Sequence, residues 1–185
     1  KMKTRQAQLS RKNELLVRAL GKTQHPLNIF DLTAGFGQDA FLMASLNHNV
    51  SLVEKNPVIA ALLQDGISRL LKEKPHYQMQ LIFNDSEIVL AAPNKQIDLI
   101  YLDPMFPEKQ KSALVKYPIQ LLQRIVGEDD NTAVILQSAI KSAKQRVVVK
   151  RPKEAGYYQA MKPLFSLSNN TLRYDVYSTA SIAET

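Results

Sequence analysis

A glycine-containing turn between two carboxylates is the first stretch of the sequence suited to binding a small charged ligand. Asp31 and Asp39 enclose Thr33–Gly37, in which Gly35 and Gly37 can adopt positive φ and let a ligand approach the backbone closely. Two negative charges repel a pyrophosphate and attract a cationic, amino-acid-like ligand. S-adenosylmethionine has this character, because it carries a sulfonium, an ammonium and one carboxylate but no phosphate. We therefore predict that Asp31, Gly35, Gly37 and Asp39 contact this cofactor.

Further acids follow later apolar segments at spacings that suit the rest of the cofactor. Glu54 lies 19 residues beyond Gly35, where an acid that binds the ribose hydroxyls is expected. Asp85, with Ser86 beside it, is placed to accept the adenine amino group. Capping of helices by these acids is the simpler alternative. The two glycines with Glu54 also match, weakly, the fingerprint of dinucleotide-binding proteins. An NAD-dependent oxidoreductase therefore stays open, although no residue stands out as its catalytic base.

Alternating strands and helices must position these residues. The sequence predicts strands at Leu27–Leu32, Val50–Val53, Leu81–Phe83, Ile97–Leu102 and Arg146–Lys150. It predicts helices at Gln8–Leu20, Gln38–Leu46, Pro57–Leu71, Glu87–Ala91, Lys111–Val126 and Thr132–Ser142, and a closing hairpin at Leu164–Ser168 and Leu172–Ser178. This order indicates an α/β fold with a doubly wound, mostly parallel, Rossmann-like sheet and a C-terminal β-hairpin. Such sheets bind ligands at the carboxyl ends of their strands, which is where the acids fall.

The composition excludes several classes of protein. Of the 185 residues, 45% are hydrophobic, which is enough for one core. No run approaches the ~18 apolar residues that span a bilayer, and no secretory signal is visible. The absence of cysteine excludes disulfides and thiolate metal sites, and the three histidines are scattered. We expect a cytoplasmic protein without a membrane segment or a metal. Since nothing marks a dimer face, we also expect a monomer.

The net charge of +7 is concentrated in two stretches. Residues 1–22 carry seven basic groups and one acid, whereas residues 23–185 carry 17 basic and 16 acidic groups. We therefore expect a basic N-terminal arm or helix at 1–22, followed by one domain at 23–185. A second basic cluster spans residues 141–153. Two basic clusters suggest a polyanionic partner, most simply nucleic acid, although a solubilising tail and a solvated helix face would give the same counts.

A short motif after the fourth predicted strand carries the chemistry. Asp103-Pro104-Met105-Phe106-Pro107 resembles the Asp/Asn-Pro-Pro-Phe/Tyr signature of S-adenosylmethionine-dependent methyltransferases that modify exocyclic amines of bases, with Met105 in place of the second proline. The lone pair of such an amine is delocalised into the ring, so the amine is a poor nucleophile. The resemblance implies that Asp103 and the Pro104 carbonyl accept its two N–H bonds and localise the lone pair. Phe106 would stack on the extruded base.

A longer pattern narrows the resemblance to one family. Asp31–Phe41, Glu54–Val58, Tyr101–Lys116 and Val147–Pro152 together resemble the J-type small-subunit ribosomal RNA guanine-N2 methyltransferases of bacteria. The resemblance covers roughly residues 30–178. It implies methyl transfer from S-adenosylmethionine to the exocyclic N2 amine of one guanine, in small-subunit ribosomal RNA or in the small ribosomal subunit. A DNA amino-methyltransferase with the same motif and a non-catalytic RNA-binding module on this fold remain alternatives.

The family also implies a fold, domain limits and site residues. Residues 23–185 would form a class I S-adenosylmethionine-dependent methyltransferase domain. Since the sequence begins at Lys1, we expect 1–22 to be the remnant of a truncated N-terminal segment. The family's cofactor contacts would fall on Gln38, Asp39, Glu54, Lys55, Asp85, Ser86 and Asp103. Basic side chains after the catalytic motif and the fifth strand are predicted to hold RNA phosphates, namely Lys109, Lys111, Lys116, Lys150 and Arg151.

Overall fold

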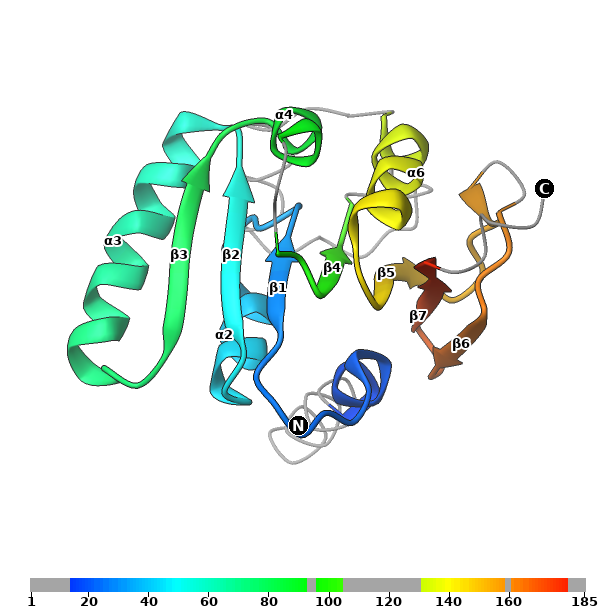
Figure 1. Cartoon of the computed structure of the whole chain (residues 1–185), viewed down its shortest axis with the longest axis horizontal. Helices are drawn as coiled ribbons and strands as arrows, with labels where there is room; N and C mark the ends of the chain where they lie inside the picture. Colours follow the sequence, from blue (N-terminus) through cyan, green and yellow to red (C-terminus); the bar gives the residue numbers. More distant parts are fainter. Residues whose placement is uncertain (1–13, 93–95, 105–130, 159–160, 180–185) are drawn as a thin grey trace, which may run out of the picture.

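One seven-stranded sheet organises residues 14–92, 96–104, 131–158 and 161–179, which are the part of the chain that the computed structural model describes. The spatial order of the strands is β3-β2-β1-β4-β5-β7-β6 (Figure 1). The strands are β1 (Asn28–Asp31), β2 (Asn49–Glu54), β3 (Gln78–Phe83), β4 (Leu99–Leu102), β5 (Arg146–Pro152), β6 (Phe165–Ser168) and β7 (Leu172–Ser178). The helices are α2 (Gln38–Ser45), α3 (Pro57–Glu73), α4 (Ser86–Ala91) and α6 (Thr132–Ser142), and residues 14–20 form a further helical segment.

The topology confirms the predicted doubly wound sheet and its C-terminal hairpin. Strands β1 to β5 pair in parallel, whereas β7 pairs antiparallel with both β5 and β6. The chain builds β1, β2 and β3 outward in one direction and then returns to place β4 and β5 on the other side of β1. The order of strands therefore reverses between β1 and β4. In open α/β sheets, ligands bind outside the carboxyl ends of the strands at such a reversal.

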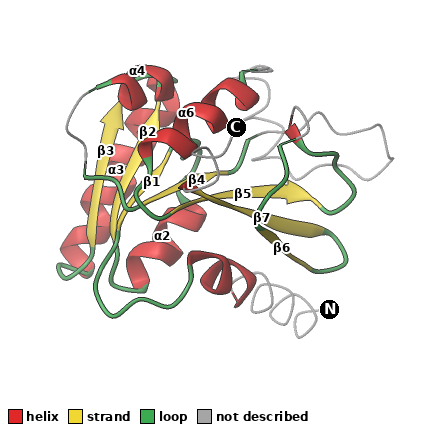
Figure 2. Ribbon diagram, turned by 45° about the vertical axis from the view of Figure 1, so that its right-hand side comes forward, coloured by secondary structure: helices red, strands yellow, loops and turns green. Residues whose placement is uncertain are grey.

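Apolar side chains cover both faces of the sheet. One core cluster joins α2, α3 and residues 14–20 to the sheet, and a second joins α4 and α6 to the opposite face. Figure 2 shows α2 on one side of the sheet and α4 and α6 on the other. In β4, Leu99 and Tyr101 belong to the first cluster and Ile100 and Leu102 to the second. A strand buried on both faces is a continuous apolar run, which is why the sequence predicted β4 and β5 clearly. Within the described residues, no helix is both long and apolar enough to cross a membrane.

Strand β3 is longer than the apolar run that predicted it. It begins at Gln78 rather than Leu81, and it pairs with β2 along its whole length. Gln78 and Gln80 are exposed, and the Gln80 side chain donates a 2.9 Å hydrogen bond to Ser51 Oγ. Because β3 lies at an edge of the sheet, polar residues can alternate along it. Pairing with β2, rather than hydrophobicity, sets its length.

Part of the predicted basic arm packs against the core. Residues 14–20 are helical, Leu16 and Ala19 are fully buried, and Leu20 is 2% exposed. This segment therefore contributes apolar side chains to the hydrophobic core of the domain, in addition to its charge. The rest of the predicted helix at Gln8–Leu20, before residue 14, and the predicted helix Lys111–Val126 lie outside the described residues.

The packing of residues 14–20 makes a stability prediction. Leu16→Ala should lower the free energy of unfolding by about 2–5 kcal/mol, because it removes a buried side chain and leaves a cavity. Val17→Ala, at a 39% exposed position on the same helix, is the matched control and should change stability by less than about 0.5 kcal/mol. Urea unfolding followed by circular dichroism measures both. Equal unfolding midpoints for the two variants would show that the segment is not part of the core.

Candidate active site

An acid stands at the carboxyl end of each of four neighbouring parallel strands. Asp31 ends β1, Glu54 ends β2, Asp85 follows β3 and Asp103 follows β4. Because these strands are parallel, their carboxyl ends share one edge of the sheet, on both sides of the reversal in strand order. Asp31 is 2% exposed and Glu54 is 8% exposed. The structure thus gathers the acids that the sequence singled out.

The glycine turn between β1 and α2 has the backbone that the sequence required. Gly35 and Gly37 have φ of 51° and 69°, in the left-handed region that favours glycine. The Gly37 N–H donates a 2.8 Å hydrogen bond to the Ala34 carbonyl, and Gly37 precedes the first turn of α2. A Cβ at Gly37 would lie 3.0 Å from a Leu63 methyl carbon. The turn is therefore packed closely against α3, and it brings Gln38 and Asp39 to the start of α2.

Thr33 ties the glycine turn to the catalytic motif. Its N–H donates to Asp31 Oδ1 at 3.1 Å, and its hydroxyl lies 3.4 Å from the same oxygen. The backbone N–H of Asp103 donates to Thr33 Oγ1 at 2.6 Å. One threonine thus joins the ends of β1 and β4 at the reversal in strand order. Sequence reasoning missed this role because the contact joins residues 70 positions apart.

Lys150 lies inside the site, bound to two carboxylates. Its ammonium donates to Asp39 Oδ2 at 2.9 Å and also to Asp103 Oδ2. The Tyr101 hydroxyl donates to the same Asp39 oxygen at 2.7 Å. The side chain of Lys150 is 17% exposed, and that of Asp39 is 11% exposed. This is not the open surface position expected of a lysine that holds RNA phosphates.

Arg151 is also enclosed, on the opposite face of the sheet. Its guanidinium lies 3.8 Å from the centroid of the Tyr158 ring, and the residue is 6% exposed. Successive side chains of a strand point to opposite faces, so Lys150 and Arg151 lie on different faces of the sheet. The predicted phosphate contacts rested on their charge and their place at the end of the fifth strand, and neither registers this alternation.

Burial and neighbouring charges shift the pKa values of the site. Burial raises the pKa of Asp31 to about 7, and the carboxylates of Asp39 and Asp103 add to this effect, while the Thr33 N–H and Lys150 oppose it. Burial alone would lower the pKa of Lys150, but the carboxylates of Asp103 and Asp39 raise it above its ordinary value. Lys150 is therefore a cation at neutral pH, and Asp31 titrates near neutrality.

Glu54 and Asp85 are held by the starts of the helices that follow them. Glu54 Oε1 accepts a 2.8 Å hydrogen bond from the Asn56 N–H, just before α3. Asp85 accepts from the Glu87 N–H at 2.8 Å and caps α4, and its other oxygen lies 3.8 Å from the Lys55 ammonium. The capping alternative is thus correct for Asp85, yet its side chain remains 38% exposed.

Ser86 has a structural contact, and two exposed apolar residues near it escaped the sequence reasoning. The Ser86 hydroxyl donates to the Leu32 carbonyl at 2.7 Å, which ties α4 to the end of β1. Phe83 and Ile88, close to Asp85 in the sequence, are 61% and 60% exposed. Exposed apolar side chains of this kind can pack against a flat ring of a ligand. Only burial, which the sequence does not give, distinguishes them from core residues.

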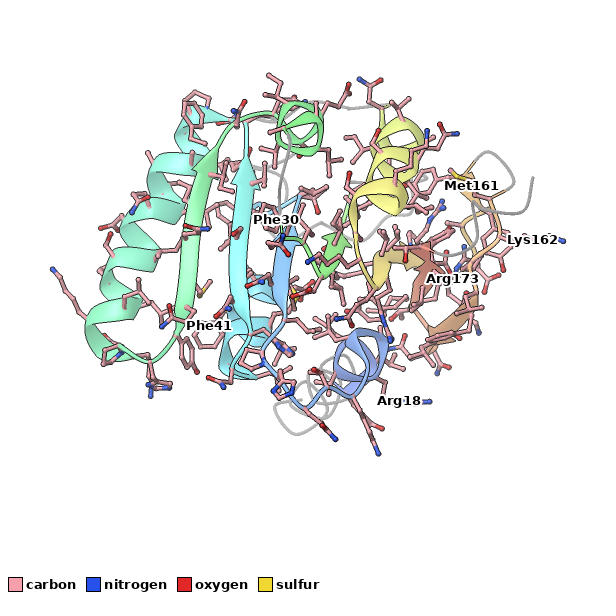
Figure 3. All side chains as sticks on the ribbon, viewed as in Figure 1. Arg18, Phe30, Phe41, Met161, Lys162 and Arg173 are labelled. Atoms are coloured by element: carbon pink, nitrogen blue, oxygen red, sulfur yellow. The ribbon has the colours of Figure 1, made fainter. Side chains whose placement is uncertain are left out.

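An apolar cavity of about 680 Å³ lies beside the glycine turn. Gly37, Gln38 and Asp39 line part of it, and apolar side chains of the turn, α2, α3, β2 and β3 line most of the rest. The rings of Phe41 and Tyr77 lie 5.7 Å apart, and Figure 3 shows Phe41 on the side of the molecule where β3 and α2 lie. Asp31, Glu54 and Asp103 do not line this cavity, so the acidic edge, rather than the cavity, is the candidate site.

Several predicted site residues cannot be placed. Phe106, Lys109, Lys111 and Lys116 lie outside the described residues, whereas Pro104 is described and buried. Within the described part of the chain, no group of three His, Cys, Asp or Glu side chains could hold a metal ion.

The strand order and the acidic edge define an α/β protein of the S-adenosylmethionine-dependent methyltransferase class. The chain matches the family described as putative SAM-dependent methyltransferase over residues 1–179, and it belongs to that family. A SAM-dependent methyltransferase structure from Neisseria gonorrhoeae matches with a TM-score of 0.70 at 32% identity, covering 93% of this chain and 73% of that one. These findings confirm the fold class and favour S-adenosylmethionine over NAD.

Curated relatives bear out the narrower resemblance. The ribosomal RNA small subunit methyltransferases J of Coxiella burnetii and Aeromonas salmonicida are each 43% identical to this chain, over 169 and 160 residues. The matches cover 90% and 84% of this chain, and 66% and 64% of the relatives. The chain therefore spans about two-thirds of the length of the curated relatives it matches.

The raised pKa of Asp31 predicts how stability depends on pH. Unfolded aspartate titrates near pH 4, so between about pH 4 and 7 the folded state holds a proton that the unfolded state has released. The stability contributed by this group is present at low pH and is lost as pH rises towards 7. Asp31→Asn removes the buried charge and should be more stable than the wild type at pH 8, by about 2–4 kcal/mol.

The same variant should match the wild type near pH 4.5, because Asp31 is then protonated. Asp65→Asn, which removes an exposed ion pair with Arg69 on α3, is the control and should stay within about 0.5 kcal/mol of the wild type at every pH. Urea unfolding between pH 4.5 and 8 measures the difference. Parallel stability curves for Asp31→Asn and the wild type would contradict the shifted pKa.

Proposed function

We propose that the protein transfers a methyl group from S-adenosylmethionine to the exocyclic N2 amine of a guanine in small-subunit ribosomal RNA. The observation that carries the proposal is the fixed position of Asp103, beside the glycine turn at the reversal in strand order. Thr33 holds its backbone N–H, and Lys150 contacts its carboxylate. The names of the curated relatives support the substrate.

The acidic edge fits S-adenosylmethionine by its chemistry. Asp39 and Asp103 share the one ammonium of Lys150, with Asp31 nearby, so the carboxylates leave a net negative charge, which suits a ligand with a sulfonium and an ammonium. Glu54, which is 8% exposed, offers carboxylate oxygens for ribose hydroxyls, and Asp85 offers an acceptor for the adenine amino group. When bound, the cofactor supplies a methyl group that its sulfonium has already activated.

The task of the protein is then to orient the amine. Asp103 and the Pro104 carbonyl accept the two N–H bonds of the guanine amine, localise its lone pair and aim it at the methyl group. The buried Pro104 limits the freedom of this loop. Phe106 would stack on the base after it has left its helical stack. Orientation and hydrogen bonding therefore supply the catalysis, and no metal is needed.

We propose a smaller set of RNA contacts than the sequence predicted. Because Lys150 and Arg151 are enclosed, we assign the phosphate contacts to the predicted residues Lys109, Lys111 and Lys116. Such contacts make binding depend strongly on salt and position the RNA without selecting the base.

We also propose that the protein acts in the cytoplasm as a monomer, since its near-neutral body offers no clear dimer face.

The first test is transfer of label from radioactive S-adenosylmethionine to small ribosomal subunits from cells that lack the enzyme. Naked ribosomal RNA and duplex DNA serve as parallel substrates. We expect label in ribosomal RNA, recovered as N2-methylguanosine. Label in DNA would keep the fold and cofactor but contradict the substrate, and label in no substrate despite cofactor binding would favour the non-catalytic module.

Asp103→Ala tests the catalytic assignment. Loss of the carboxylate should lower kcat by at least ~100-fold, the scale of losing one key electrostatic contact to the transition state. Binding of the RNA should stay within ~3-fold of the wild type, because phosphate contacts dominate affinity. Asp65→Ala, which removes an exposed carboxylate of α3, is the control with wild-type kcat. Full activity in Asp103→Ala would show that the mechanism is wrong.

A further inference from the structure

We propose that Lys150 is a positioning residue whose ammonium fixes the carboxylates of Asp103 and Asp39 and thereby orients the acceptor that meets the substrate amine. The role differs from the RNA contact that the charge of Lys150 and its place at the end of the fifth strand had predicted. It rests on the proposed function, because the oriented amine is that of the proposed reaction.

The register of the sheet directs Lys150 into the site. Lys150 lies opposite Tyr174 in the antiparallel pair of β5 and β7, and Val148 lies opposite Val176. Val148, Val176 and Tyr174 belong to the core cluster that contains α2, so Lys150 emerges on the same face as α2. The register of β5 therefore directs the Lys150 side chain towards Asp39.

One ammonium joins two segments that are far apart in the sequence. Asp39 belongs to the first turn of α2, whereas Asp103 follows β4, and both bind the Lys150 ammonium through their Oδ2 atoms. The Tyr101 hydroxyl also donates a hydrogen bond to Asp39 Oδ2. Hydrogen bonds between charged groups are strong and directional, and the low exposure of Lys150 protects them from water. The Asp103 carboxylate is thus restrained by its side chain, and its backbone is restrained by Thr33.

The charges around the ammonium explain why the position needs a cation. Carboxylates face it from three elements, Asp39 on α2, Asp103 after β4 and Asp31 on β1, and the hydroxyls of Tyr101 and Tyr174 lie nearby on β4 and β7. Without Lys150 these carboxylates would repel one another or take up a proton. A protonated Asp103 could donate a hydrogen bond to the amine and would then not localise its lone pair. Lys150 keeps Asp103 in the acceptor form.

The positioning role and a phosphate-binding role predict different kinetics. A phosphate contact contributes to RNA affinity and to its dependence on salt, so its loss raises KM and leaves kcat unchanged. A lysine that orients the acceptor acts in the transition state, so its loss lowers kcat. Lys153, three residues further on and exposed, provides a matched control for the loss of one positive charge.

The experiment compares Lys150→Met, Lys150→Arg and Lys153→Met in methyl transfer to small ribosomal subunits. Lys150→Met should lower kcat by at least ~30-fold, with KM for the subunit within ~3-fold of the wild type. The kcat of Lys150→Arg should fall between those of Lys150→Met and the wild type, because arginine keeps the positive charge but changes the geometry of the contacts. Lys153→Met should keep the wild-type kcat. A wild-type kcat with a raised KM in Lys150→Met would overturn the proposal in favour of a phosphate contact.

Two pH measurements separate positioning from general damage to the fold. In Lys150→Met, the acid limb of the kcat profile should move to higher pH, because the carboxylates lose their cation and hold protons longer. The melting temperature of this variant should fall at pH 8 and approach that of the wild type near pH 5. An equal loss of stability at both pH values would contradict the proposal. If Lys150→Met does not fold, Lys150→Arg provides the test. A reduced kcat, with the acid limb of its pH profile where the wild type has it, supports positioning. An unchanged kcat contradicts it.

The wild-type protein separates this inference from the proposed function. If the wild type labels no substrate, the proposed function fails, and the pH dependence of unfolding still tests the ionic bridge. If the wild type labels ribosomal RNA and Lys150→Met does so at the same kcat, the role of Lys150 alone is wrong.

Discussion

The bridge from Asp39 through Lys150 to Asp103 is the interaction on which the candidate site depends. Three carboxylates at one edge of a sheet would repel one another in a partly buried setting, and a single ammonium makes the arrangement tenable. The bridge joins the start of α2, the end of β4 and the end of β5. It spans the point where the order of strands reverses, so the most constrained polar contacts coincide with the place where such sheets bind ligands.

Asp31 shows that the site is not built for stability alone. Its carboxylate is nearly inaccessible to water and its pKa is about 7, so ionising it costs the folded state free energy. A cationic ligand beside it would favour the ionised form and offset that cost on binding. Thr33 holds this carboxylate next to the Asp103 backbone. Hydrogen bonds through Thr33 therefore link Asp31, which is proposed to contact the cofactor, to Asp103, which is proposed to bind the substrate amine.

The sequence predicted the sheet well, because strands buried on both faces appear as apolar runs and helices alternate with them. It also found the acids at the strand ends, since position relative to a strand is a local property. It could not place Thr33 or Lys150, whose partners across the site lie 47 to 111 residues away. Lys150 was assigned to RNA from its charge and its place at the end of the fifth strand, whereas the alternation of side chains along β5 turns it towards α2. The polar edge strand β3 was cut short for a related reason, because its pairing is not visible in its own residues.

Calorimetric binding of S-adenosylmethionine and NAD to the same protein tests most directly whether the acidic edge is built for a cationic cofactor without phosphates. The account predicts that S-adenosylmethionine binds, that Glu54→Gln weakens this binding by about tenfold through a poorer ribose contact, and that NAD shows no binding. NAD binding of similar strength, or S-adenosylmethionine binding that is unchanged in both Glu54→Gln and Asp31→Asn, would contradict it.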